Sequence, residues 1–288
     1  MYLEIGIIAA FGAMLCWGVG DFFIQRTTRK IGDIGAIAFM SLIGALGLLP
    51  FVLGDIHFLF QLNNLALLLL LSLAAVVAAL LNFEALKRGK LSVVDVVLQA
   101  ELPVTVFLGF LFFSETLSAM QAIFIGLIVL GVALIAAGTD LRRFMKNSEK
   151  GIVLAFIAAI AMGFVNFLTA AGSRQMSPVL IIWAPWLVAA VVAFAFLLKT
   201  DGASKTVKKA LKYRKLLIAM GIFETAAWLL FAVAVLENPL SITVAISQSY
   251  PAIALMFGVL VNREKIVRHQ YLGAAIVLIS SFMLGIIV

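Results

Sequence analysis

Ten long apolar runs follow one another along the chain, separated by short segments rich in glycine, proline or charged residues. Most runs are apolar on every face, which is typical of helices that contact lipid. A helix needs about 20 such residues to cross a bilayer, whereas barrel strands would be about 10 residues long with alternating polarity. The pattern therefore predicts an all-α polytopic membrane protein with ten transmembrane helices, over residues 5–25, 34–54, 65–86, 92–113, 119–138, 151–171, 178–198, 216–236, 240–261 and 269–288.

The composition of the chain supports this fold class. Of 288 residues, 64% are hydrophobic and 12% are charged, about half of the charged share of a soluble domain. Cys16 is the single cysteine, so no disulfide forms within the chain. The segment before the first apolar run contains Glu4 and no basic residue. A signal peptide has a positively charged segment there, so we expect the first run to be a permanent helix. The longest polar stretch, 199–215, is predicted to form a short basic surface helix.

Basic residues are distributed very unevenly between the loops. Twenty of the 21 Lys and Arg residues follow odd-numbered runs, and only Arg174 lies on the other side. This bias predicts a protein of the cytoplasmic membrane with its odd-numbered loops in the cytoplasm and both termini outside. The net charge of +7 then reports topology and attraction to anionic lipid. A nucleic-acid partner is not expected, because stretch 199–215 contains only one aromatic residue that could stack on bases, Tyr213.

The two halves of the chain resemble each other. Residues 6–22, GIIAAFGAMLCWGVGDF, align with 151–167, GIVLAFIAAIAMGFVNF, and LSVVDVVLQ at 91–99 aligns with LSITVAISQ at 240–248. A repeat of five helices is odd in number, so the second copy enters the membrane from the opposite side, as in many secondary transporters. We expect a first repeat over 1–138, a basic cytoplasmic linker over 139–150 and a second repeat over 151–288. Polar residues also match in order, Glu115 with Glu264 and Gln121 with Gln270.

These segments resemble the drug/metabolite transporter superfamily, in particular the EamA type with ten helices. The resemblance covers essentially the whole chain and implies a carrier for small metabolites, with a central cavity lined mainly by helices 1, 3, 4, 6, 8 and 9. Asn166, Ala232 and Tyr250 do not repeat the acids of the first half, so a symmetric acidic site is not expected. The resemblance rests on AMLCWGVGDF at 13–22, ALKRGKLSVVDVVLQAELPV at 85–104, and the SET…Q and NRE…Q elements at 114–121 and 262–270.

Acidic residues inside the apolar runs are the main candidates for function. An Asp at a helix centre costs roughly 2.5–3.5 kcal/mol on insertion scales, and no Lys or Arg lies deep in any run. Glu101 and Glu224 lie near mid-depth and are predicted to bind substrate or carry protons. Their alternative role is a carboxyl that hydrogen-bonds a neighbouring helix as a packing contact. Asp21 and Asp95 lie nearer the cytoplasmic ends, where Asp95 could instead pair with a basic residue of the preceding loop or cap its helix.

Other polar and aromatic residues lie at similar depths. Pro103 and Pro251 are predicted hinges for gating, or static bends that shape the cavity. Trp17 and Trp228 are predicted either to bind substrate or to fill apolar space. Trp183 and Trp186 suit an interfacial aromatic belt. Asn82 is expected to pack near the membrane interface. The remaining predicted binding residues are Trp17, Trp228, Gln99, Gln248, Asn166 and Tyr250.

The leading hypothesis is a secondary active transporter that moves a small polar metabolite, such as an amino acid or amine, by alternating access. Acids with aromatics and no deep basic residue favour a cationic or zwitterionic substrate, and proton coupling and export both agree with this. The alternatives are a neutral sugar or metabolite uptake carrier of the same superfamily, and a channel. An enzyme is not expected, because His57 and His269 lie near loops on opposite sides. No metal or cofactor is expected, and the protein is expected to be a monomer or homodimer.

Overall fold

The computed structural model describes residues 5–88, 97–137, 149–200, 203–260 and 266–288, and every regular element in them is a helix. The all-α prediction is therefore confirmed. Eight helices of this described part are long and apolar enough to cross a membrane. Two further apolar helices, Glu101–Phe113 and Ala119–Ile135, are shorter. Helix length among the described residues therefore supports eight spanning helices, and the predicted total of ten is not confirmed.

In the first half, the helices begin and end close to the predicted apolar runs, with one exception. The fourth run, expected as one helix over 92–113, is interrupted at residues 99–100, and its long described helix begins at Glu101. Gly32, with φ of 85°, allows the sharp turn between the first two helices. Ser114, with φ of 54°, ends the helix that begins at Glu101. The elements are α1 (Ile5–Ile31), α2 (Asp33–Val52), the 3₁₀ helix η1 (Leu53–Phe60), α3 (Leu62–Arg88), α5 (Glu101–Phe113) and α6 (Ala119–Ala137).

The second half contains corresponding long helices, together with an added basic helix between the second and the third of them and a short helix before the break in its ninth run. Ser177 caps its second long helix by accepting hydrogen bonds from the backbone N–H groups of Val179 and Leu180. The added helix lies within 199–215 and confirms the predicted basic helix; its lysines are exposed and its Thr206 and Ala210 are buried. The elements are α8 (Glu149–Gln175), α9 (Pro178–Lys199), α10 (Ala203–Lys212), α11 (Arg214–Glu237), α12 (Leu240–Ser247), α13 (Pro251–Leu260) and α14 (Arg268–Ile286).

The ninth apolar run, expected as one continuous helix over 240–261, is interrupted. Regular α-helix stops at Ser247, residues 248–250 form a turn, and α13 begins at Pro251. Proline is well tolerated as the first residue of a helix because its missing N–H needs no partner there. A similar turn at residues 99–100 precedes α5 in the first half. Both halves therefore change backbone direction at corresponding positions.

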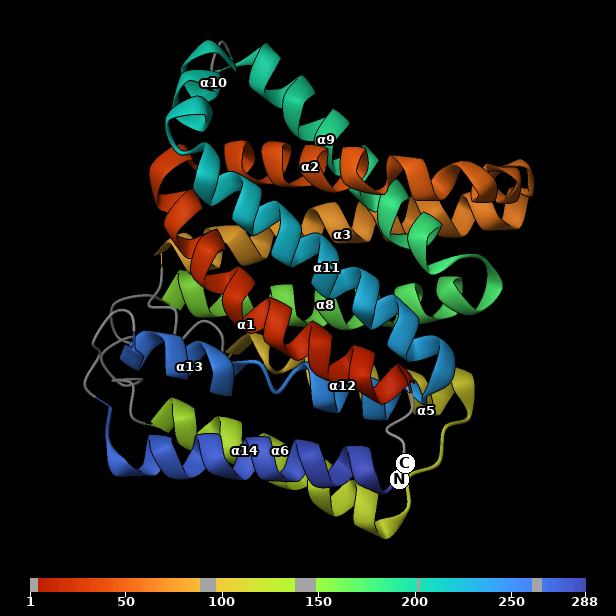
Figure 1. Ribbon diagram of the computed structural model, residues 1–288, viewed down its shortest axis with the longest axis vertical. Coiled ribbons are helices and arrows are strands. Elements are labelled where there is room, and N and C mark those ends of the chain that lie inside the picture. Colours follow the sequence, from red (N-terminus) through yellow and green to blue (C-terminus); the bar gives the residue numbers. More distant parts are fainter. Residues whose placement is uncertain (1–4, 89–96, 138–148, 201–202, 261–265) are drawn as a thin grey trace.

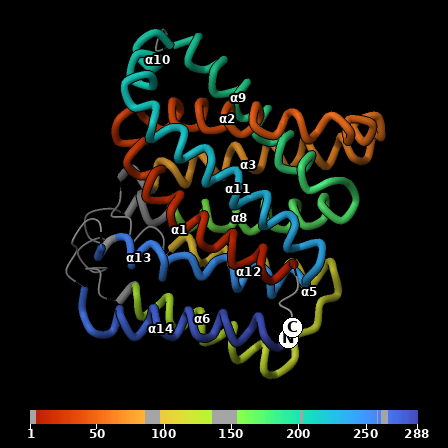
Figure 2. Tube along the Cα trace, in the orientation of Figure 1, coloured from red at the N-terminus to blue at the C-terminus, as the bar shows by residue number. Residues whose placement is uncertain are grey.

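The long helices pack in pairs, and each pair joins one helix of the first half to one helix of the second half. The first helix of each half packs against the third helix of the other, α1 on α11 and α8 on α3. The second helices α2 and α9 pack together, and so do the last helices α6 and α14. In Figure 1, α2 and α9 lie at one end of the molecule and α6 with α14 at the other. The four helices α1, α3, α8 and α11 lie between them, as the tube of Figure 2 also shows.

Large apolar side chains cover much of the outer surface. Phe60, Leu62, Phe110 and Leu198 are each at least 60% exposed. A soluble monomer rarely exposes so much contiguous apolar surface, whereas helices in a bilayer face lipid tails with such side chains. The exposed apolar surface and the long apolar helices together describe a multi-pass membrane protein.

Candidate functional site

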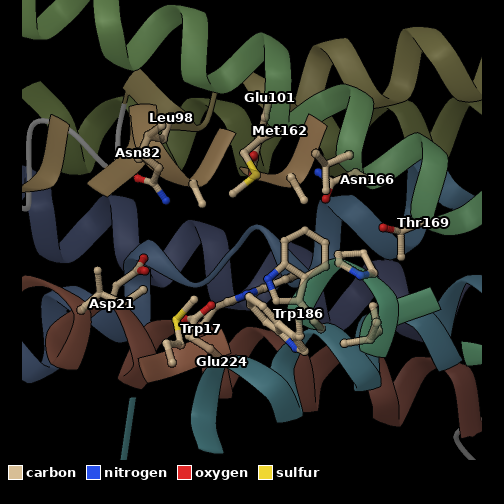
Figure 3. Close-up of a pocket in the computed structure, with 18 of the residues that line it drawn as sticks. Trp17, Asp21, Asn82, Leu98, Glu101, Met162, Asn166, Thr169, Trp186 and Glu224 are labelled. Atoms are coloured by element: carbon tan, nitrogen blue, oxygen red, sulfur yellow. The ribbon is translucent and has the colours of Figure 1, made fainter. Parts of the chain in front are cut away.

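A cavity of about 90 Å³ lies among the central helices, well above the roughly 10–15 Å³ that one water molecule needs. Its walls come from α1, α3, α8 and α11, and from the helix breaks before α5 and α13. These are the six helices that the family resemblance implied. α2 contributes Met40, and α9 contributes Ile181, Ile182, Pro185 and Trp186. Figure 3 shows the cavity between two layers of helix.

The structure brings most of the predicted binding residues to this cavity. Gln99 is buried but does not line it, and Asp95 lies outside the described residues. Neither hinge candidate contacts the cavity: Pro103 is exposed in the first turn of α5, and Pro251 is buried at the start of α13. The predicted residues that line the cavity are Trp17, Asp21, Glu101, Asn166, Glu224, Trp228, Gln248 and Tyr250.

Three carboxyl groups dominate the chemistry of the cavity. Asp21, Glu101 and Glu224 are 7%, 6% and 5% exposed. They approach closely enough for Asp21 to interact electrostatically with both glutamates, and Tyr250 hydrogen-bonds Asp21. None of the described residues lining the cavity is Lys, Arg or His. The site is therefore strongly acidic, with no compensating cation among its described lining residues.

The carboxyls come from opposite walls. Asp21 and Glu224 belong to the packed pair α1–α11, and Figure 3 shows them in one layer. Glu101, the first residue of α5, enters from the facing layer beside Met162. Close packing of α1 on α11 fixes the position of the Glu224 carboxyl, since a Cβ at Gly20 would lie only 2.5 Å from Glu224 Oε1.

An aromatic cluster lies beside the carboxyls. The ring of Trp17 meets that of Trp228 edge to face, with centroids 5.2 Å apart and an interplanar angle of 85°. Trp17 also lies 5.6 Å from Phe231 and 6.4 Å from Tyr250. Such contacts hold the indoles in fixed orientations. The cluster offers π-faces to a bound cation within an otherwise apolar wall.

Two glycines set the positions of Glu101 and Tyr250. A Cβ at Gly163 in α8 would lie 2.5 Å from the Val104 side chain and 3.3 Å from the Glu101 carbonyl oxygen. A Cβ at Gly18 in α1 would lie 2.6 Å from the Ile253 side chain and 3.2 Å from the Tyr250 carbonyl oxygen. The same close crossing thus occurs once in each half. Glu101 directly follows its helix break and Tyr250 is the last residue of the other, and both line the cavity.

Several buried polar atoms of the cavity wall have no hydrogen-bond partner among the described residues. They are the acceptors Glu224 Oε1, Gln248 Oε1 and Asn82 Oδ1, and the donor Trp186 Nε1. Buried polar groups are nearly always paired with protein or water, so these atoms are available to water or a ligand. Three of the four are acceptors, which suits a ligand rich in N–H groups.

Sequence reasoning missed three cavity residues whose side chains can form hydrogen bonds. Trp186, assigned to an interfacial belt, is half-buried and lines the cavity; its neighbour Trp183 donates to the Ala45 carbonyl at 3.0 Å. Asn82, expected to pack near the interface, also lines it, as does Thr169. An amide inside an apolar run was a usable signal for Asn82, but no local pattern distinguishes which tryptophans of α9 face inward.

Comparison with known proteins agrees with the fold and the repeat. The EamA-like transporter family matches residues 4–137 and again residues 149–286. A solved crystal structure superposes with a TM-score of 0.73 over 99% of both chains, at 13% sequence identity, which shows a shared fold. A search of curated proteins gives no match. Because the family covers nearly the whole chain in two successive copies, the chain belongs to the EamA-like transporter family, within the drug/metabolite transporter superfamily.

Proposed function

We propose that this family member is a secondary active transporter that moves a small cationic or zwitterionic metabolite across the cytoplasmic membrane by alternating access. The observation that supports this most is a cavity that combines three buried carboxyls with tryptophan rings and no described basic lining residue. Carboxylates and π-faces both attract cations, and low polarity around them strengthens the attraction. An anionic substrate would meet repulsion instead.

The architecture proposed for this carrier is ten helices in two inverted repeats, 1–138 and 151–288, joined by a basic linker over 139–150. The packing of each long helix on a helix of the other half supports two inverted repeats. The charge bias supports cytoplasmic odd-numbered loops and outside termini. Pro103 and Pro251, close to the two helix breaks, are the proposed hinges. Nothing in this mechanism requires more than one copy, and a homodimer is compatible with it.

Each group in the cavity has a proposed role. Asp21, Glu101 and Glu224 pair with the substrate cation or hold protons in its absence. Trp17 and Trp228 stabilise the cation through their rings. The polar side chains that complete the site, by direct contact or next to it, are Asn166, Gln248, Tyr250, Gln99 and Asp95.

Exchange of substrate for protons follows from these carboxyls. A protonated carboxyl cannot pair with a cation, so protons and a cationic substrate compete for the same groups. Lowering the pH should therefore weaken binding of the cation. Release of the substrate on one side and protons on the other would couple the two fluxes.

Transport by purified protein in liposomes tests this function. A thermal-stability panel of lysine, choline, alanine and glucose first identifies binders, since ligands of the folded state raise Tm. Uptake of the best labelled binder is then measured at several pH values for the wild type, Glu101→Gln and Glu224→Gln. Loss of one buried ion pair should reduce uptake at least about tenfold, which corresponds to about 1.4 kcal/mol, and should flatten the pH dependence.

Asp55→Asn, in η1 and outside the cavity, is the matched control and should behave as wild type. Normal uptake with unchanged pH dependence in both glutamate variants would contradict the proposed roles. Stabilisation by glucose alone would favour the neutral-metabolite carrier instead.

A further inference from the structure

We infer that the preferred substrate of this cavity is a linear dication, a small α,ω-diamine with an apolar spacer, which the carboxyls on two facing walls bind at its two ends. This rests on the proposed function and narrows its substrate class. The starting observation is the number of acids: three buried carboxyls and no basic side chain among the described lining residues.

A single positive charge does not satisfy this site. One ammonium pairs well with one carboxylate, and the other two carboxyls then need protons or further cations, since an unpaired buried charge is strongly unfavourable. A dication neutralises two carboxylates at once and leaves one group for a proton. The charge of the cavity is therefore matched better by two cationic ends than by one.

The arrangement of the carboxyls favours cationic ends that are separated in space. Asp21 and Glu224 lie together in the α1–α11 layer, and Glu101 enters from the facing layer (Figure 3). A ligand with an ammonium at each end reaches both walls across the cavity.

The remaining wall suits the middle of such a ligand and its N–H groups. Trp17, Trp186 and Met162 present apolar surface between the two layers, which suits a methylene spacer. Each ammonium carries three N–H donors, and the unpaired acceptors Gln248 Oε1 and Asn82 Oδ1 are available to those that the carboxylates do not use.

Binding of 1,4-diaminobutane and 1-aminobutane, which differ by one amino group, tests the inference on the full-length purified protein. We expect the diamine to bind at least about tenfold more tightly to the wild type, and the difference to disappear in Glu101→Gln. Glu224→Gln, on the opposite wall, is the second variant, and Asp55→Asn should keep the wild-type preference.

The outcomes separate this inference from the proposed function. Equal affinity of the two amines for the wild type would overturn the diamine assignment and leave a cation carrier in place. A diamine preference that survives in both glutamate variants would also overturn it. Binding of neither amine, together with stabilisation by a neutral sugar, would overturn the cationic site as a whole.

A separate observation concerns Arg174, the one basic residue outside the positively charged loops. Its guanidinium lies 3.5 Å from Glu115 Oε1 and stacks over Phe113 at 4.2 Å. It also donates to the backbone carbonyls of Val235, at 3.2 Å, and Asn238, at 3.4 Å. The loop after α5 is thereby tied to the end of α8 and to the α11–α12 connection.

Glu115 extends this link to the start of α12. Its carboxylate accepts hydrogen bonds from Leu240 N at 2.6 Å, Ser241 N at 2.9 Å and Ser241 Oγ at 2.7 Å. A carboxylate at a helix N-terminus is stabilised by the unpaired N–H groups there. A residue of the first repeat thus caps the broken helix of the second.

We propose that Glu115 and Arg174 form a latch that holds this end of the transporter closed and must separate when the end opens. Arg174 lies five residues beyond Thr169, the last α8 residue that lines the cavity. The latch joins elements of both repeats, and these are the elements that move apart when alternating access opens this side.

Cysteine labelling tests the latch directly. In a Cys16→Ser background, Thr169→Cys is reacted with a charged maleimide in intact proteoliposomes. Adding Arg174→Gln or Glu115→Gln should raise the labelling rate about tenfold, and Arg174→Lys, which keeps the charge but loses the planar fork, should give an intermediate rate. Gln175→Ala, at an exposed neighbouring position, is the control. Unchanged labelling in all three latch variants would overturn the latch, whatever the substrate.

Discussion

At the scale of single residues, glycine and glutamate define the site together. The acids provide charge, but their positions depend on places where one helix must approach another closely. Gly18 and Gly163, matched in the two halves of the sequence, each face the residues after a helix break. A side chain at either position would displace the backbone that carries Tyr250 or Glu101.

We expect Gly163→Ala to weaken amine binding without changing any charge. The added methyl group would meet Val104 at 2.5 Å and the Glu101 carbonyl at 3.3 Å, so α5 must shift and carry its carboxyl with it. Thermal unfolding and 1,4-diaminobutane affinity, measured on the same sample, give the outcome.

Gly126→Ala is the matched control, because nothing lies within 4 Å of a Cβ at Gly126. That change should leave binding intact and stabilise α6 by up to about 1 kcal/mol through helix propensity. If Gly163→Ala binds and melts like Gly126→Ala, the close crossing does not position Glu101.

At the scale of elements, α6 and α14 form a seam apart from the cavity. A Cβ at Gly131 would lie 2.8 Å from the Gly273 carbonyl oxygen, and one at Gly273 would lie 2.5 Å from the Gly131 carbonyl oxygen. The two backbones therefore touch, as small residues permit between membrane helices. Ala122 and Gly126, also in α6, are exposed instead.

The repeated glutamines provide a test of this seam. Gln121 and Gln270 both cap their helices, accepting from Ser118 N at 2.8 Å and Val267 N at 3.1 Å. Only Gln270 also donates across the seam, to the Ile135 carbonyl at 2.9 Å. We expect Gln270→Ala to lower the free energy of unfolding by about 1–3 kcal/mol more than Gln121→Ala.

Unfolding of the two purified variants, followed by tryptophan fluorescence in denaturant, measures the difference. Equal destabilisation would show that capping alone explains the matched glutamines and that the bond to Ile135 contributes nothing.

At the scale of the whole molecule, two five-helix halves complete each other. The first and third long helices of each half pack mainly on the other half. The cavity lies where these pairs meet and takes acids from α1, α5 and α11. The acids of the cavity are distributed asymmetrically between the repeats, because Asn166 and Tyr250 occupy the positions of the second repeat that correspond to Asp21 and Glu101.

The predicted orientation belongs to this scale and has a direct test. In intact cells and a Cys16→Ser background, His57→Cys in η1 should react with a membrane-impermeant thiol reagent. Lys208→Cys on α10 should react only after permeabilisation, because the basic loops are retained in the cytoplasm. Both positions are exposed, so accessibility differs only by side. Reversed labelling would show the opposite topology.

The sequence by itself determined the class of fold, the approximate helices, the repeat and the three acids that line the cavity. These follow from local physics: apolar runs must be helical in lipid, and a carboxyl in such a run is costly enough to indicate function. Only the tertiary structure decided which of these residues meet. It placed Trp186 and Asn82 in the cavity and left Gln99 outside it. It also broke the ninth run at 248–250 and joined Arg174 to Glu115. The reason is that helices apolar on every face have no inward side that a pattern can mark, so only packing between the halves sets their rotation.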